Sequence, residues 1–148
     1  MVKDLAEILS EYDLQRDSYR SFTKSGDARN KDTLLEFQSR FTDIKADLRY
    51  YHSKLTRNWT RFDDKSATAI KFRLAIAISQ GEYKDKEGKP IFDACSINQA
   101  EKFASGSDKY KEFVDKRAFH KESLVNISDL RDDISSYLME IQQRLKLQ

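Results

Sequence analysis

The sequence is poor in residues that make turns and crosslinks: its 148 residues include four Gly, one Pro and one Cys. Because a β-rich chain needs many turns, and Gly and Pro supply most of them, this scarcity argues against a β-rich fold. A single cysteine, Cys95, excludes an internal disulfide bond and a Cys-rich zinc site. We interpret Cys95 as a small buried or half-buried side chain rather than a catalytic thiol.

A long apolar run is missing as well. No stretch approaches the roughly 18 residues that cross a bilayer. The first residues, Met1-Val2-Lys3-Asp4, also lack the apolar core of a signal peptide. We therefore expect a cytoplasmic protein that does not associate with membranes.

Motifs for catalysis and cofactor binding are absent too. The chain has two histidines, no Gly-rich phosphate loop and no His-Glu-x-x-His motif. Asp63-Asp64 and Asp132-Asp133 are adjacent pairs, and adjacent residues on a helix point about 100° apart, so neither pair easily shares a metal ion or a proton. His120 falls on an apolar helix seam and is interpreted as a packed core histidine. We expect no enzyme activity, no metal, no cofactor and no small-molecule substrate.

Charged residues are abundant, at 35% of the chain against 39% apolar residues. This composition, rich in Lys, Glu, Asp, Leu and Ala, is typical of long helices. We predict an all-α fold with two long heptad-patterned helices and shorter helices, in a single helical domain over residues 1–148.

The first heptad pattern predicts a long basic helix over residues 33–80. Asp32 or Thr33 can cap its start, and Gly81 can accept the left-handed conformation that ends it. Its seam steps alternately by three and four residues, with polar breaks at Asn58 and Lys65. The seam residues are Leu34, Phe37, Phe41, Ile44, Leu48, Tyr51, Leu55, Asn58, Phe62, Lys65, Ala69, Phe72 and Ile76.

The second heptad pattern predicts a long C-terminal helix over residues 107–147, capped by Ser107. Ahead of it, Ser96-Ile97-Asn98-Gln99 fits a capping box and starts a short helix over 96–105, after a loop over 81–95. Residues 1–30 are predicted to form a short helix and a loop that breaks at Ser25-Gly26-Asp27. The second seam is Tyr110, Phe113, Arg117, His120, Leu124, Ile127, Arg131, Ile134, Leu138, Ile141 and Leu145.

The apolar faces of the two long helices are too wide to be buried by one antiparallel partner. Trp59, Ile70, Val114, Ala118 and Tyr137 extend them beyond the seams. A short N-terminal helix cannot cover two seams of about 55 Å at 1.5 Å per residue. We therefore predict a helical bundle or coiled coil that associates into a homo-oligomer.

Positive charge is concentrated on the first long helix. From Lys45 to Arg73 there are eight Lys or Arg against three Asp, whereas the chain as a whole carries only +2. Four cations and one tyrosine fall within an arc of about 80° on a continuous helix: Tyr50, Lys54, Arg57, Arg61 and Lys65. This stripe predicts either a track for nucleic-acid phosphates or a solvated face that meets an acidic protein partner. Trp59 and Phe62, close by, could stack on bases but are expected mainly in the core.

Residues 70–146 resemble the UvsY family, the recombination mediator proteins of tailed phages. Members carry a Leu-Lys-Ala-Arg-Leu type motif before a turn with Tyr and Gly, and here Ile70-Lys71-Phe72-Arg73-Leu74 precedes Gly81-Glu82-Tyr83. Three downstream segments match the family's short helix and the start and end of its last helix: Ala100-Glu101-Lys102-Phe103, Ser107-Asp108-Lys109-Tyr110 and Ile141-Gln142-Gln143-Arg144. Family members tend to have a Tyr-Tyr pair where this chain has Ala75-Ile76-Ala77-Ile78. If those tyrosines stack on bases, Tyr83 or packing would have to replace them.

This resemblance implies a function without catalysis in DNA recombination and repair. UvsY-like proteins form oligomeric rings, bind single-stranded DNA and help a recombinase replace single-strand-binding protein. The resemblance assigns DNA contact to Lys71 and Arg73, and it places a phage-encoded protein in the host cytoplasm. The residues alone leave another class open, a structural or adaptor coiled coil whose seams bind a different protein.

Overall fold

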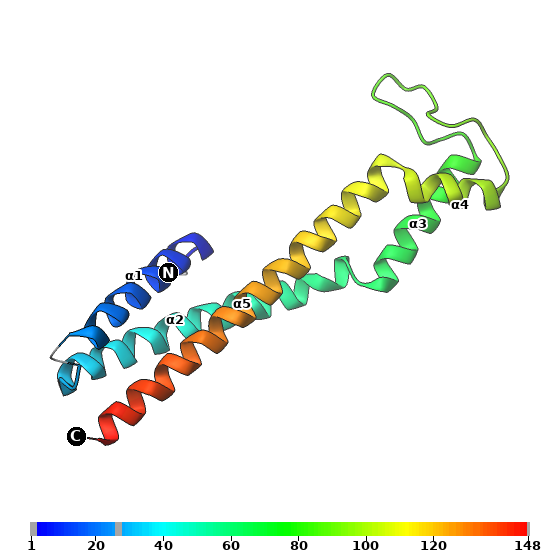
Figure 1. Cartoon of the computed structure of the whole chain (residues 1–148). Helices are drawn as coiled ribbons and strands as arrows, with labels where there is room; N and C mark the ends of the chain where they lie inside the picture. The colour runs from blue at the N-terminus through cyan, green and yellow to red at the C-terminus, as the bar shows by residue number, and fades with distance from the viewer. Residues whose placement is uncertain (1–2, 26–27, 148) are drawn as a thin grey trace. The chain divides into compact units, whose positions relative to one another are not determined.

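The computed structural model describes residues 3–25 and 28–147, and in these residues it contains five α-helices, one 3-10 helix and no strand (Figure 1). The prediction of an all-α fold is confirmed. In chain order the elements are α1 (Leu5–Lys24), α2 (Lys31–Asn58), η1 (Trp59–Arg61), α3 (Asp64–Ser79), α4 (Ile97–Gly106) and α5 (Asp108–Lys146). None of these helices is long and apolar enough to cross a membrane.

The chain divides into two compact units. The first unit comprises Met1–Leu55 and Ser123–Gln148, and the second comprises Thr56–Glu122. Each unit has its own apolar core. The second heptad seam contributes to both units, because its residues up to His120 lie in the second unit and its residues from Leu124 lie in the first.

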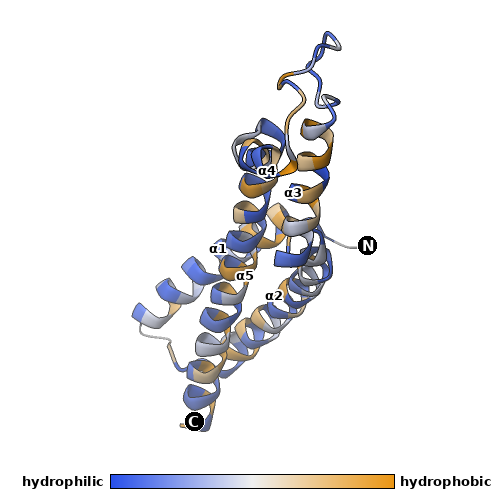
Figure 2. Ribbon diagram, turned by 90° about the vertical axis from the view of Figure 1, so that its right-hand side faces the viewer, coloured by the Kyte–Doolittle hydropathy of each residue, from blue (hydrophilic) through white to orange (hydrophobic). Residues whose placement is uncertain are grey.

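The first unit is a bundle of α1, most of α2 and the C-terminal part of α5. Both seams supply its core, and Figure 2 shows polar and apolar residues alternating around α2 and α5, as in helices that bury one face. The helix α1 is longer than predicted, because Tyr19 belongs to the buried face together with Ile8 and Tyr12. The buried core residues are Ile8, Tyr12, Tyr19, Leu34, Phe37, Phe41, Ile44, Leu48, Ile127, Ile134 and Ile141.

The start of α2 differs from the prediction by a few residues. Asn30 provides the cap, since its Oδ1 accepts a hydrogen bond from the Thr33 N–H at 3.0 Å. Asp32 and Thr33 are instead in the first turn of the helix. Of the predicted break before it, Gly26 and Asp27 lie outside the described residues, as do Met1 and Val2 at the chain start.

The long basic helix predicted over 33–80 is two helices, α2 and α3, separated at residues 59–63. Trp59–Arg61 form the 3-10 turn η1, and Asp63 then caps α3 by accepting the Ser66 N–H at 2.8 Å. The Ser66 hydroxyl donates to the Thr60 carbonyl across the break. Two local causes coincide, because Trp59, Thr60 and Phe62 are weak helix formers and Asp63 is a strong N-cap.

The break changes which face of the following helix is buried. The first seam is buried or half-buried through Leu55, but α3 buries Ala67, Leu74, Ala75 and Ile78. The prediction that Ala69 and Phe72 continue the seam is wrong: Ala69 is exposed and Phe72 is 56% exposed. A heptad pattern stays in phase only along an uninterrupted helix, and η1 interrupts it.

The core of the second unit joins α3 and α4 and takes in part of the loop between them. Its buried members are Leu74, Ala75, Ile78, Tyr83, Ala100 and Ala104. Gly81, at φ 72°, ends α3 as predicted. Ser96 and Ser107 cap α4 and α5, each hydroxyl accepting a backbone N–H at 3.3 Å, from Gln99 and Tyr110.

We expect replacement of Asp63 by alanine to lower the melting temperature by a few degrees, because α3 loses its cap. Asp63→Asn should retain most of the stability, since asparagine also caps. The Ser66 N–H holds the pKa of Asp63 below its ordinary value of 3.8. The carboxylate therefore stabilises the fold at higher pH, and this contribution is lost as the pH falls through the folded pKa. Thermal unfolding followed by circular dichroism at neutral and at acid pH checks both points. An alanine variant as stable as wild type would show that the cap does not define the break.

Candidate nucleic-acid interface

The helix α3 carries an exposed basic surface. Lys65, Lys71 and Arg73 are its cations, and no Asp or Glu occurs from Lys65 to Gly81. Its first residue, Asp64, is paired with Arg117 of α5. None of the three α3 cations forms an ion pair with the described part of the chain. The charge on this helix is therefore available to an anionic ligand.

Around the helix axis, Phe72 lies between the cations. At 100° per residue Lys71 and Arg73 project about 100° to either side of Phe72, and Lys65 lies on the same face two turns earlier. Lys65 and Arg73 are exposed, and Lys71 is half-buried. The Lys71 ammonium lies 5.9 Å from the ring centroid of Tyr110, a cation–π contact that leads the side chain toward the start of α5. We name Lys65, Lys71, Phe72 and Arg73 together the α3 basic face, although they span about 200° around the helix axis and Lys71 lies beside the buried side of α3.

The remaining residues of the predicted stripe are divided between the two units. Tyr50 and Lys54 are exposed residues of α2 in the first unit, where the Lys54 ammonium lies 6.0 Å from the Tyr51 ring. Arg57 and Arg61 are exposed in the second unit, at the end of α2 and in η1. The arc of about 80° applies only to side chains on one continuous helix. The break at η1 therefore means that residues beyond Asn58 do not share this arc with Tyr50 and Lys54.

An aromatic cluster joins η1 to α5 within the second unit. His120 is buried, with its ring 5.7 Å from Trp59 and 5.2 Å from Phe62. Phe62 in turn stacks on Phe113 at 5.7 Å. The interpretation of His120 as a packed core histidine agrees with this position. The same contacts show that Trp59 and Phe62 are packing residues here.

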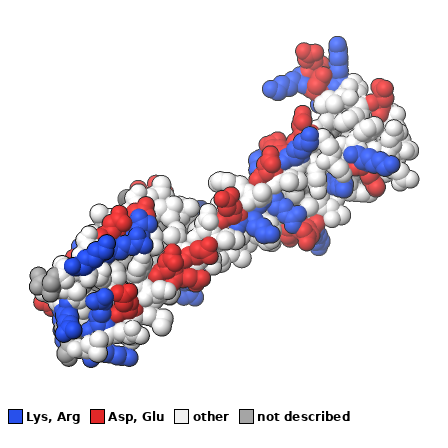
Figure 3. Space-filling view, in the orientation of Figure 1, with Lys and Arg blue, Asp and Glu red and all other residues white. Residues whose placement is uncertain are grey.

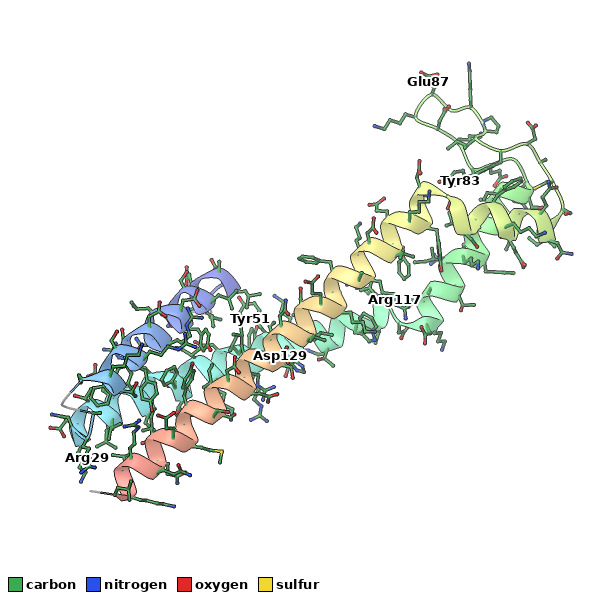
Figure 4. All side chains as sticks on the ribbon, viewed as in Figure 1. Arg29, Tyr51, Tyr83, Glu87, Arg117 and Asp129 are labelled. Carbon is green, nitrogen blue, oxygen red and sulfur yellow. The ribbon has the colours of Figure 1, made fainter. Side chains whose placement is uncertain are left out.

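Sequence reasoning missed the role of Arg117 in this cluster. Its guanidinium lies 5.7 Å from the Trp59 ring and also pairs with Asp64. Figure 4 shows the side chain on the inner side of α5, facing the segment that contains η1 and the start of α3. The only signal in the sequence was an arginine within an apolar seam. Because Asp64 neutralises it, Arg117 adds no free charge to the α3 basic face.

The loop after α3 forms a small hairpin that is not basic. Lys84 and Pro90 form an isolated antiparallel bridge, and Glu87 lies at the tip (Figure 4). Figure 3 shows Lys and acidic side chains together there. Tyr83, at the base, is buried and accepts the Lys109 N–H at 3.5 Å, so it cannot replace a base-stacking tyrosine. Positive charge without counter-charge is therefore a property of α3 and not of the hairpin.

The two adjacent Asp pairs of the sequence lie outside the α3 basic face. Asp63 caps α3 and Asp64 pairs with Arg117, while Asp132 and Asp133 are exposed on α5. Within residues 3–25 and 28–147, no group of three or more His, Cys, Asp or Glu side chains is arranged to hold a metal ion. The described surface thus offers a basic helix face as its candidate site. Comparisons with models of protein families, with curated proteins and with solved structures found no match for this chain.

Proposed function

We propose that this protein binds single-stranded DNA through the α3 basic face and acts without catalysis as a recombination mediator. The observation that carries the proposal is the run from Lys65 to Gly81, which holds three cations and no acidic residue on a solvent-accessible helix. Lysine and arginine bind phosphates by displacing condensed counterions. Cations that form no internal ion pair do not have to break one before they bind a phosphate.

The resemblance to UvsY-like mediators supports the same residues. Its basic motif corresponds to Ile70-Lys71-Phe72-Arg73-Leu74, and both cations of this motif belong to the α3 basic face. As in that family, the partners would be a recombinase and a single-strand-binding protein, which the protein helps exchange on the strand. The proposed location is the cytoplasm, and that of the host if the protein is phage-encoded.

Self-association is part of the proposal because a single α3 offers only a few phosphate contacts. Repeating the α3 basic face around a homo-oligomer would let many weak contacts act together on one strand. Exposed apolar side chains of α5, among them Val125 and Met139, leave surface in the first unit for coiled-coil packing between copies.

One observation favours the adaptor alternative. A groove of about 520 Å³ in the first unit lies between α2 and α5 and is lined in part by Leu35, Leu138 and Met139. Leu35 and Met139 are both exposed. The other lining residues are polar, so the groove offers a narrow apolar strip to the apolar face of a helix from another protein. In this alternative the α3 basic face would meet acidic residues of a protein partner.

A gel-shift experiment with poly(dT) at low salt separates the two functions, and light scattering of the same preparation gives the assembly state. The mediator proposal predicts retardation of poly(dT) by a species larger than one chain. The absence of retardation would contradict it and favour the adaptor. A chain that retards poly(dT) as a monomer would remove self-association from the proposal while leaving DNA binding.

A further inference from the structure

Phe72 is an exposed aromatic side chain that the fold does not use. It is 56% exposed and is not part of the core of the second unit. Its ring makes no aromatic contact with the described residues. Burying a large apolar ring is favourable, and the fold leaves most of the Phe72 ring in water. A ligand that covers Phe72 would therefore gain this free energy on binding.

The other aromatic rings around the α3 basic face are already engaged. Tyr110 contacts the Lys71 ammonium and the Phe113 ring. Trp59 stacks on His120 and Tyr83 is buried. Phe72 is therefore the ring on this face whose surface is open to a ligand.

The charges around Phe72 identify what kind of ligand fits. Its neighbours in sequence, Lys71 and Arg73, are both cations, Lys65 lies on the same helix face, and no carboxylate occurs on α3 after Asp64. A ligand for this surface needs negative charge on both sides of a flat apolar group. Nucleic acid with unpaired bases has this arrangement, since each base is flanked by backbone phosphates and exposes an aromatic face.

We infer that Phe72 stacks on a base of the bound strand while Lys71 and Arg73 bind the phosphates on either side, an inference that rests on the proposed function. Bases in a duplex are already stacked on each other and offer no free face within the helix. Phe72 thereby makes the α3 basic face selective for single strands over duplexes. The phosphate contacts alone carry no such preference.

Fluorescence titration with oligo(dT) and with an abasic deoxyribose-phosphate strand of equal length tests this inference. Stacking on one base strengthens binding by roughly 5- to 140-fold, so wild type should bind oligo(dT) tighter than the abasic strand by about this factor. Phe72→Ala should lose most of this difference and leave abasic binding unchanged. Phe72→Leu keeps an apolar side chain without a ring and should resemble Phe72→Ala, whereas Phe72→Trp should bind oligo(dT) at least as well as wild type.

Ile91→Ala serves as the matched control, because Ile91 is a similarly exposed apolar residue of the same unit, at 50%. It should bind both strands as wild type does. If the Phe72 variants keep the preference for oligo(dT), or if Phe72→Ala alters the assembly seen by light scattering, the inference is overturned while DNA binding stands. If wild-type protein binds neither strand, the proposed function itself fails.

Discussion

Replacing both Lys71 and Arg73 by alanine should weaken binding to single-stranded DNA by at least about tenfold at low salt. Each subunit loses two phosphate contacts, and this loss is repeated for every subunit bound along the strand. The dependence on salt should change as well. Each phosphate contact to a single strand contributes about 0.7 to the slope of log K against log salt, so the slope should become less steep by about 1.4 for each bound subunit. A fluorescence titration at several salt concentrations measures both quantities.

Lys84→Ala with Lys86→Ala is the matched control for this experiment. It removes the same charge from the hairpin of the same unit, where acidic residues such as Asp85 and Glu87 accompany the lysines. This control should bind DNA almost as wild type does. Equal losses in the two double variants would mean that total charge, and not the α3 basic face, governs binding. If the Lys71/Arg73 variant loses helix content or assembly, these two residues are structural.

Phe41→Ala should cost about 3–5 kcal/mol of folding free energy, the largest effect on stability that we expect. Phe41 is fully buried in the first unit, with its ring stacked on Tyr137 at 5.3 Å and edge-on to Tyr19 at 5.9 Å. Since domains are stable by only about 5–15 kcal/mol, this loss should remove a large fraction of the stability of the first unit.

Urea unfolding followed by circular dichroism measures the effect of Phe41→Ala. Leu14→Ala provides a control of similar apolar character, because Leu14 of α1 is 62% exposed and its replacement should change the free energy of unfolding by less than about 0.5 kcal/mol. A loss below about 1 kcal/mol for Phe41→Ala would contradict the three-helix core described for the first unit.

The seams could be predicted where one helix continues without interruption. Apolar periodicity gives the buried face of a helix directly. It predicts Phe41 and Leu48 of α2 as core residues, and Ile127, Ile134 and Ile141 of α5. The caps at Ser96 and Ser107 could also be predicted, because a serine at the start of a helix accepts a free backbone N–H of the first turn.

The break at η1 could not be found from periodicity, because the stepping by three and four continues through it by coincidence. The signal in the sequence is Asp63, which is part of an acidic pair and is also a residue type that favours the N-cap of a helix. When the heptad pattern is extended through this break, it places Phe72 in the core. It also places Arg61 and Lys65 on one stripe with Tyr50 and Lys54. Periodicity cannot detect such a change of phase, whereas capping chemistry can.

The charged residues of the candidate site could be predicted from the sequence, but the residues that they contact could not. Lys71 and Arg73 were selected by the resemblance and the net charge of the segment. The Tyr110 ring that Lys71 contacts lies 39 positions further along the chain, and the pairing of Arg117 with Asp64 spans 53. Contacts at such separations depend on how α3 and α5 pack, for which one sequence carries no direct signal.

The central claim, that α3 binds an unpaired DNA strand by its cations, is tested most directly by titrating wild-type protein with fluorescent oligo(dT) over a series of salt concentrations. We predict tight binding in dilute buffer and a linear fall of log K with log salt, with a slope that reflects several phosphates per bound unit. An affinity that does not change with salt, or no binding even in dilute buffer, would contradict the account.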